Sequence, residues 1–452
     1  MTPCAVASRK TIDIVSLGCS KNLVDTERLM KLLADAGFNT RFEPSVTDST
    51  PSEAVVINTC GFIGDAKEES IEAILSWAEA KKQGRTGKLI VMGCLSQRYL
   101  SELRDEIPEV DIWRGKHDWA DIVGTLARSY PATASYDRVI TTPRHHAYLK
   151  VAEGCNRFCS FCAIPLITGR FHSRPVDEIV AEAELLTARG VSELNVIAQD
   201  LSSYGVDLYG RHSLAELTDR LADVEGIRRI RLHYAYPADF PMDVMDVMAR
   251  RDNVCSYMDI ALQHIADPVL AKMRRHITST QTRALLSEMR SRVPDLHIRT
   301  TLMVGFPGEG EREFEQLMEF VAEQRFERLG AFAYCEEEGT FGAAHHPDTI
   351  PAEVKQERLS RLMELQESIS MEHQQSKVGK HLNVVIDREE ADYYVGRTEY
   401  DSPEVDPEVL VNKTMPLRPG DYVDVEITGA LPFELIGTPA TEDNATDNAT
   451  QA

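Results

Sequence analysis

The stretch that decides the fold of this chain is Glu153-Gly154-Cys155-Asn156-Arg157-Phe158-Cys159-Ser160-Phe161-Cys162. Its three cysteines are spaced C-x3-C-x2-C, and they directly follow an apolar run that predicts a buried strand over 147–151. Three close thiolates on one loop can hold three irons of a cubane cluster and leave the fourth iron open to a substrate or cofactor. Structural zinc is the alternative, but zinc normally takes four protein ligands, and His172 is the conceivable fourth ligand nearby.

Strand-like and helical patterns alternate downstream of this stretch. Short β-branched and aliphatic runs predict six strands, at 147–151, 194–198, 230–234, 258–262, 298–304 and 329–334. Amphipathic patterns predict the intervening helices, at 176–189, 213–224, 242–250, 280–292 and 311–324. Because such alternation builds a parallel sheet, we expect a partial or complete β/α barrel domain over 141–376. A long charged helix at 352–377 leads out of it.

The N-terminal part repeats the alternation upstream. Runs at 12–18, 53–59 and 88–93 predict buried strands, and they lead directly to Cys19, Cys60 and Cys94. A helical pattern follows each strand, and Ser20 is a candidate cap for the first helix. The pattern predicts a parallel α/β domain over 10–125. Open α/β sheets bind ligands beyond the C-terminal strand ends, so the three thiols are expected to converge there; ordinary core cysteines are the alternative.

The C-terminal part of the chain has the pattern of a different structural class. Short runs at 383–386, 393–397, 410–411 and 421–427, separated by turn residues, predict a small all-β domain over 377–440. The tail at 441–452 is rich in Thr, Asn, Asp and Ala, which predicts disorder. The expected fold class is therefore α/β, with a parallel N-terminal domain, a central barrel and a small β domain.

Composition limits the classes of function. With 43% hydrophobic residues, no apolar run near the roughly 20 residues of a membrane span and no secretory signal at 1–10, we expect a cytoplasmic protein. The net charge of −23 argues against broad capture of nucleic acid, although a local basic groove remains compatible with it. Nine cysteines in a reducing compartment indicate metal or redox chemistry rather than a disulfide framework. Cys4, Cys255 and Cys335 are isolated, and we expect no special role for them.

The spacing of Cys155, Cys159 and Cys162 at the first barrel strand resembles the radical S-adenosylmethionine superfamily. The resemblance implies that these residues, the barrel trio, hold a 4Fe–4S cluster whose open iron binds S-adenosylmethionine. With three further cysteines in an N-terminal domain and a small C-terminal β domain, the chain resembles the methylthiotransferases over roughly 10–440. In that family the small domain is called TRAM. By the same resemblance Cys19, Cys60 and Cys94, the N-terminal trio, hold a second 4Fe–4S cluster that carries the transferred sulfur, and two molecules of S-adenosylmethionine are used.

The resemblance also suggests where S-adenosylmethionine binds. The end of the second barrel strand and the strand end with its Gly/Pro turn at 299–309 correspond to the family's cofactor contacts. The expected contact residues are Asn195, Gln199, Asp200, Arg299, Thr301 and Gly305. Turn glycines and helix caps are the alternative explanation for these positions. Gln263 and His264 end the fourth strand, where a role at the barrel mouth and a structural histidine are equally compatible with the sequence.

The substrate branch is indicated by two motifs and by charge. The stretches Cys19–Asp25 and Tyr400–Asp406 resemble the branch that modifies an aspartate β-carbon of ribosomal protein S12; the tRNA branch typically has Gln-Met-Asn after its first cysteine. Residues 376–440 carry thirteen acidic and six basic side chains, which suits a basic protein better than RNA phosphates. Glu404, Asp406 and Glu408 are expected docking residues, and a flavodoxin or ferredoxin is the expected electron donor. The alternatives are a tRNA methylthiotransferase and a non-catalytic metal-binding protein of the ribosome.

Overall fold

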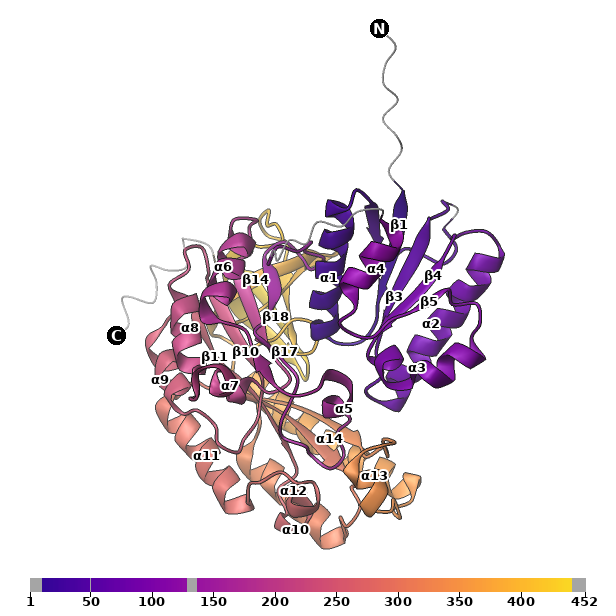
Figure 1. Cartoon of the computed structure of the whole chain (residues 1–452). Helices are drawn as coiled ribbons and strands as arrows, with labels where there is room; N and C mark the ends of the chain where they lie inside the picture. The colour runs from indigo at the N-terminus through magenta and orange to yellow at the C-terminus, as the bar shows by residue number, and fades with distance from the viewer. Residues whose placement is uncertain (1–9, 49, 128–135, 441–452) are drawn as a thin grey trace. The chain divides into compact units, whose positions relative to one another are not determined.

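The computed structural model describes residues 10–48, 50–127 and 136–440, which form two compact units (Figure 1). The first unit contains residues up to Thr141 together with Glu153–Asn156 and Cys162–Phe171. The second contains Thr142–Ala152, Arg157–Phe161 and the residues from His172 onward. Cys4 and the tail at 441–452 lie outside the described residues. Within the described chain, every helix is too short or too polar to cross a membrane.

The first unit is a parallel sheet with helices on both faces, as predicted. The strand order is β2-β1-β3-β4-β5. One core lies between the sheet and helices α1 and α4, and a second lies between the opposite face and helices α2 and α3 (Figure 1). Both faces of β3 and β4 are therefore buried, which explains their continuous apolar sequences. The bounds are β1 Thr11–Ser16, α1 Ser20–Asp35, β2 Asn39–Phe42, β3 Ala54–Thr59, α2 Gly64–Lys82, β4 Leu89–Gly93, α3 Cys94–Glu106, β5 Ile112–Trp113 and α4 Trp119–Leu126.

Three details of this unit differ from the sequence prediction, the first being helix α4, which was not predicted. The edge strands β2 and β5 were not predicted, because the first is only partly buried and the second has two residues. Ser20 is not the cap of α1: Cys19 occupies the N-cap position with extended backbone, and Ser20 is the first helical residue. The shift by one residue matters because it places a thiol, rather than a hydroxyl, at the helix N-terminus.

The second unit contains the predicted partial barrel. Six parallel strands follow the order β13-β12-β11-β10-β9-β6, and the sheet stays open between β13 and β6. All six strands lie at the predicted positions: β6 His146–Lys150, β9 Glu193–Ile197, β10 Arg229–Ala235, β11 Val254–Gln263, β12 His297–Val304 and β13 Arg328–Ala333. A two-stranded sheet pairs β7 Ala152–Glu153 with β8 His172–Ser173.

Helices α6, α8, α9, α11 and α12 follow their strands as predicted, and α14 packs against β13 (Figure 1). Several helices of three to six residues were not predicted. The bounds are α5 Ile164–Thr168, α6 Val176–Thr187, η1 Leu201–Ser203, α7 Val206–Tyr209, α8 Leu214–Ala222, α9 Asp243–Arg250, α10 Asp267–Lys272, α11 Ser279–Arg292, α12 Glu311–Gln324, α13 Phe341–His345 and α14 Ala352–Gln375.

The C-terminal strands close into a small barrel, which confirms the predicted all-β domain. The strand order is β14-β15-β16-β18-β17, around a core that includes Val384, Val409 and Val425. The last strand was not predicted, and it closes the barrel by pairing with both β16 and β17. The bounds are β14 His381–Glu389, β15 Tyr393–Arg397, β16 Glu408–Asn412, β17 Tyr422–Leu431 and β18 Glu434–Pro439.

A buried layer of charge joins this small barrel to the starts of the β/α-barrel strands. Arg397 at the end of β15 bonds the carboxylates of Glu193, the first residue of β9, and Asp387 of β14. Arg328, the first residue of β13, forms an ion pair with Asp401, and both side chains are at most 4% exposed. The C-terminal domain therefore contacts the N-terminal strand ends, opposite to the ends that are expected to carry the chemistry.

Candidate cysteine sites at the strand ends

Each cysteine of the N-terminal trio begins or precedes a helix. Cys19 is the N-cap of α1, Cys94 is the first residue of α3, and Cys60 follows β3 directly. Helices α1 and α3 thus each carry a thiol at the N-terminus, where negative charge nearby is favoured. The structure thus places the trio at the C-terminal ends of three neighbouring parallel strands, as the sequence predicts.

The three thiols also lie near one another. Gly18 has φ +92°, and a Cβ there would come within 2.9 Å of the Cys60 sulfur, so glycine lets the two loops approach. Burial raises the pKa of Cys94 to about 12; Lys116 partly offsets this, and nearby Cys19 and Cys60 add to it. Three soft donors from three separate loops therefore converge on one location.

Asn22 ties the three cysteine loops together, and sequence analysis did not identify it. Its side-chain nitrogen donates to the carbonyl oxygens of Leu17 at 3.1 Å and Thr59 at 3.0 Å, just before the loops of Cys19 and Cys60. Its oxygen accepts from the Cys94 thiol at 3.5 Å. The side chain is 1% exposed. The available signal in the sequence was that Asn22 is an amide residue in the first turn of the helix that follows Cys19, a candidate ligand.

The loop of the barrel trio is shaped by close backbone contacts. A Cβ on Gly154, which has φ +85°, would lie 2.1 Å from the carbonyl oxygen of Arg170, so only glycine fits. The backbone N–H of Cys155 donates to Gly169 at 3.3 Å. Phe158 of this loop is 47% exposed, with φ 49°. Phe161 instead packs edge-to-face against a buried ring, Phe306.

Arg275 is a buried cation beside the second cysteine of this loop, and sequence analysis missed it. Its guanidinium donates to the Cys159 sulfur at 3.3 Å and to the carbonyl oxygen of Ala261. Tyr236 lies close to two guanidiniums, with Arg275 at 4.1 Å and Arg157 at 4.3 Å from the ring centre. Nothing in the local sequence signals this contact, because Arg275 is more than a hundred residues from Cys159.

Two predicted cofactor residues, Asn195 on β9 and Asp200 shortly after it, are buried and only partly bonded. Asp200 accepts from Arg157 of the cysteine loop at 2.6 Å and from Ser203 at 2.5 Å through one oxygen. Its other oxygen and the side-chain nitrogen of Asn195 are buried without a hydrogen-bond partner in the described part of the chain. Gln199 directly follows β9. Open donors and acceptors at a strand end fit a polar ligand such as an amino-acid or ribose group.

The predicted residues on and after β12 divide into two groups. Thr301 is half-buried in the strand, and Gly305 follows it, with its N–H donating to Glu309. A Cβ at Gly305 would meet Lys355 of α14 at 2.4 Å, so a neighbouring side chain already explains this glycine. Arg299 lies near the start of the strand and donates to Asp406 at 3.2 Å. We therefore leave Arg299 out of the proposed cofactor site.

His264 is a structural histidine. One ring nitrogen contacts Glu309 at 3.1 Å, the other accepts from the backbone N–H of Ala266 at 3.0 Å, and the ring is fully buried. Glu309 in turn bonds Arg358 of α14. Both ring nitrogens therefore have protein partners, and one of them is linked through Glu309 to α14, which resolves the alternative left open by the sequence.

Zinc ligation fits the cysteine sites poorly. Tetrahedral zinc brings its sulfur ligands within about 4 Å of one another. Among the described residues, one group of three candidate ligand atoms meets a limit of 4.8 Å, and it consists of His145, His146 and Asp387 rather than either cysteine trio. Sulfurs bound to separate irons of a cubane need not be so close. If each trio held a cubane cluster, its three thiols would leave one of the four irons without a cysteine ligand.

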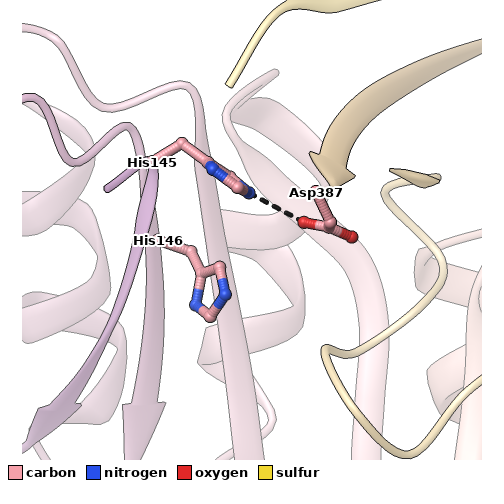
Figure 2. A group of neighbouring side chains, drawn as sticks. All are labelled: His145, His146 and Asp387. Carbon is pink, nitrogen blue, oxygen red and sulfur yellow. Dashed lines mark hydrogen bonds and ion pairs between the residues drawn. The ribbon is translucent and has the colours of Figure 1, made fainter. Parts of the chain in front are cut away.

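The His145, His146 and Asp387 group belongs to the buried charge layer instead. His145 contacts Asp387 at 2.7 Å, with His146 beside it (Figure 2). Arg397 already bonds both Asp387 oxygens, at 2.7 and 2.9 Å. Burial lowers the pKa of His146 to about 4, and Arg397 adds to this effect, so the ring is neutral. A metal ion there would have to displace Arg397, and we assign the group no metal.

The same layer corrects the expected docking surface. The Asp406 side chain is 2% exposed and accepts from Tyr257 at 2.7 Å and from Arg299, so its carboxylate is not open to a partner protein. Glu408 forms an ion pair with Arg388. Of the three acidic residues expected to dock a partner, Glu404 is the one that is exposed. Part of the acidity of the C-terminal domain therefore balances arginines of the β/α barrel.

Comparison with known proteins agrees with this arrangement. Family models match residues 11–115 (Uncharacterized protein family UPF0004), 149–321 (Radical SAM superfamily) and 378–439 (TRAM domain). Two relatives called ribosomal protein uS12 methylthiotransferase RimO are each 55% identical. The one from Parabacteroides distasonis matches over 95% of this chain and 99% of its own length, and the one from Porphyromonas gingivalis over 94% and 98%.

Solved structures support the fold alone. The radical S-adenosylmethionine methyltransferase TsrM from Kitasatospora setae, solved with tryptophan and a cofactor analogue, aligns with a TM-score of 0.52. The alignment covers 71% of this chain and 72% of that chain at 14% identity. The sequence relatives, in contrast, are similar over almost their whole length and share one name. This chain belongs to the ribosomal protein uS12 methylthiotransferase family.

Proposed function

We propose that this protein replaces a hydrogen on the β-carbon of an aspartate in ribosomal protein uS12 with a methylthio group. The observation that carries the proposal is the placement of two cysteine trios at C-terminal ends of parallel strands, in a chain 55% identical to relatives with that name. The proposed cofactors are two 4Fe–4S clusters and S-adenosylmethionine. A β-methylene hydrogen is unactivated, so a radical route is chemically reasonable where no side-chain base could remove a proton.

The proposed roles divide between the trios. The barrel trio, Cys155, Cys159 and Cys162, would hold the cluster that binds S-adenosylmethionine. When both are present, the cluster and S-adenosylmethionine together supply a 5′-deoxyadenosyl radical. Arg275 would support that site through its N–H contact to the Cys159 sulfur. Asn195 and Asp200 would bind polar groups of S-adenosylmethionine through atoms that lack protein partners, with Gln199, Thr301 and Gly305 as further candidate contacts. Burial of these groups would keep water from the reactive carbon.

The N-terminal trio would hold the second cluster, which carries the sulfur to be methylated and transferred. Asn22 would keep the three loops in register, because its amide bonds reach the loops of Cys19 and Cys60 and the sulfur of Cys94. A second S-adenosylmethionine would donate the methyl group. A flavodoxin or ferredoxin would supply electrons, and basic uS12 would be the partner, with no nucleic-acid substrate.

Cofactor cleavage tests the proposal and the division of labour. Reconstituted protein, incubated without oxygen with S-adenosylmethionine and a strong reductant, should release 5′-deoxyadenosine. Cys159→Ala should abolish this release. Cys60→Ala should retain it but transfer no methylthio group to uS12. Loss of cofactor cleavage in Cys60→Ala protein that keeps its barrel cluster would contradict the division, and no cleavage by the intact protein would favour a non-catalytic role.

A further inference from the structure

A buried lysine lies at the same sheet edge as the N-terminal trio. Lys116 follows β5, the strand next to β4, and its side chain is 2% exposed. Its ammonium contacts Asp25 of α1 at 3.0 Å, the Asn22 oxygen at 3.3 Å and Glu153 at 3.8 Å. Four neighbouring strands thus deliver three thiols and one cation to their C-terminal ends.

The ammonium and the Cys94 sulfur share one oxygen. The side-chain oxygen of Asn22 is 3.3 Å from the Lys116 nitrogen and 3.5 Å from the Cys94 sulfur. Two carboxylates, Asp25 and Glu153, lie beside the buried ammonium, and these contacts favour its charged form. Isolated buried charges are costly, and a partner set that fixes a lysine beside thiols indicates a role for its charge.

We propose that Lys116 is a positioning residue of the N-terminal cysteine site, and that its charge offsets the negative charge of the thiolates and of the cluster they hold. The inference rests on the proposed second cluster and deepens it. Reduction adds an electron to a cluster, so a fixed positive charge nearby favours the reduced state, whereas a negative charge opposes it. Asp25 holds the ammonium of Lys116 in place and partly cancels its positive charge. The two residues should therefore have opposite effects on the reduction potential.

Measuring the midpoint potential of the N-terminal cluster tests whether Lys116 and Asp25 shift it in opposite directions. The full chain with the barrel trio replaced by alanine retains one cluster, whose potential is measured by titration followed by electron paramagnetic resonance. In this background Lys116→Met should lower the potential and Asp25→Asn should raise it. Lys116→Arg keeps the positive charge, so its midpoint potential should stay close to that of the parent protein. Lys82→Met serves as a control, because Lys82 is an exposed lysine of the same unit bonded to Glu109.

Opposite shifts support the inference. Shifts in the same direction would indicate loosened structure rather than charge, and unchanged potentials in both variants would also overturn it. If Lys116→Met cannot keep a cluster, Asp25→Asn decides: a raised potential supports the charge role, and a lowered or unchanged one overturns it. If the parent background binds no cluster at all, the proposed second cluster is wrong, and this inference falls with it.

Discussion

Replacing Arg397 by methionine should strongly destabilise the second unit. The guanidinium is fully buried and donates five hydrogen bonds: two to Asp387, two to Glu193 and one to the carbonyl oxygen of Asp401. Methionine fills much of the same volume but leaves two buried carboxylates without their closest cation. Removing one partner of a buried ion pair typically costs about 3–5 kcal/mol in the free energy of unfolding. We expect a loss in that range.

Arg388→Met is the matched control. Arg388 lies on β14 of the same small domain and is paired with Glu390 and Glu408, but its side chain is 48% exposed. Exposed ion pairs contribute about 1 kcal/mol or less. The two variants remove the same side chain from the same domain, so the difference between them isolates the effect of burial.

The pH dependence gives a second check. Burial raises the pKa values of Glu193 and Asp387, but Arg397, together with Arg231 near Glu193 and His145 beside Asp387, holds both below their ordinary values. A carboxylate with a lowered pKa contributes stability above its unfolded pKa of about 4, and this stability is lost as pH falls through the folded pKa. The variant lacks this contribution. The stability difference between wild type and Arg397→Met should therefore be largest near neutral pH and should narrow below about pH 4.

Urea denaturation and hydrogen exchange measure the effect. All three tryptophans, Trp77, Trp113 and Trp119, lie in the first unit, so their fluorescence reports that unit. Hydrogen exchange over 381–397 reports the second unit, and far-ultraviolet circular dichroism reports the secondary structure of both. Arg397→Met should shift part of the circular dichroism transition to lower urea and increase exchange over 381–397, with little change in the fluorescence transition. Equal, small shifts for both arginine variants would refute the idea that this layer holds the C-terminal domain in place.

Two further predictions concern metal content and docking. Protein reconstituted without oxygen should bind about eight irons with matching sulfide, and alanine at either cysteine trio should remove about half; stoichiometric zinc with little sulfide would contradict both cluster assignments. Glu404→Gln should weaken binding to uS12, with a smaller effect at high salt, whereas Asp406→Asn should lower the urea midpoint of the second unit. Equal effects of the two variants on uS12 binding, measured at several salt concentrations, would argue against this separation.

Much of the fold follows from local sequence. Buried parallel strands are rich in apolar and β-branched residues, so all six strands of the β/α barrel and the strands before each N-terminal cysteine were predicted from short runs of such residues. Short or half-exposed strands such as β2 and β5 have no such signal. The cysteines were identified because thiols at strand ends are unusual. Their orientation relative to one another depends on Asn22, whose amide looks like any polar residue of a first helical turn.

The charged residues were the hardest to interpret. Lys116, Arg275 and Arg397 are buried because partners far along the chain neutralise or accept from them, and sequence distance hides those partners. Asp406 was expected on a docking surface for the same reason. Counting charged residues gives the sign of a domain's net charge. It does not separate acidic side chains that face solvent from those that balance arginines inside the fold.

The central claim is tested most directly by the state of ribosomal protein uS12 in cells. Tandem mass spectrometry of uS12 should find a methylthio-aspartate with the gene present and an unmodified aspartate after its deletion. Wild type should restore the modification, and Cys159→Ala should not. If uS12 is the same with and without the gene while a methylthio-nucleoside disappears from tRNA, the substrate assignment is contradicted.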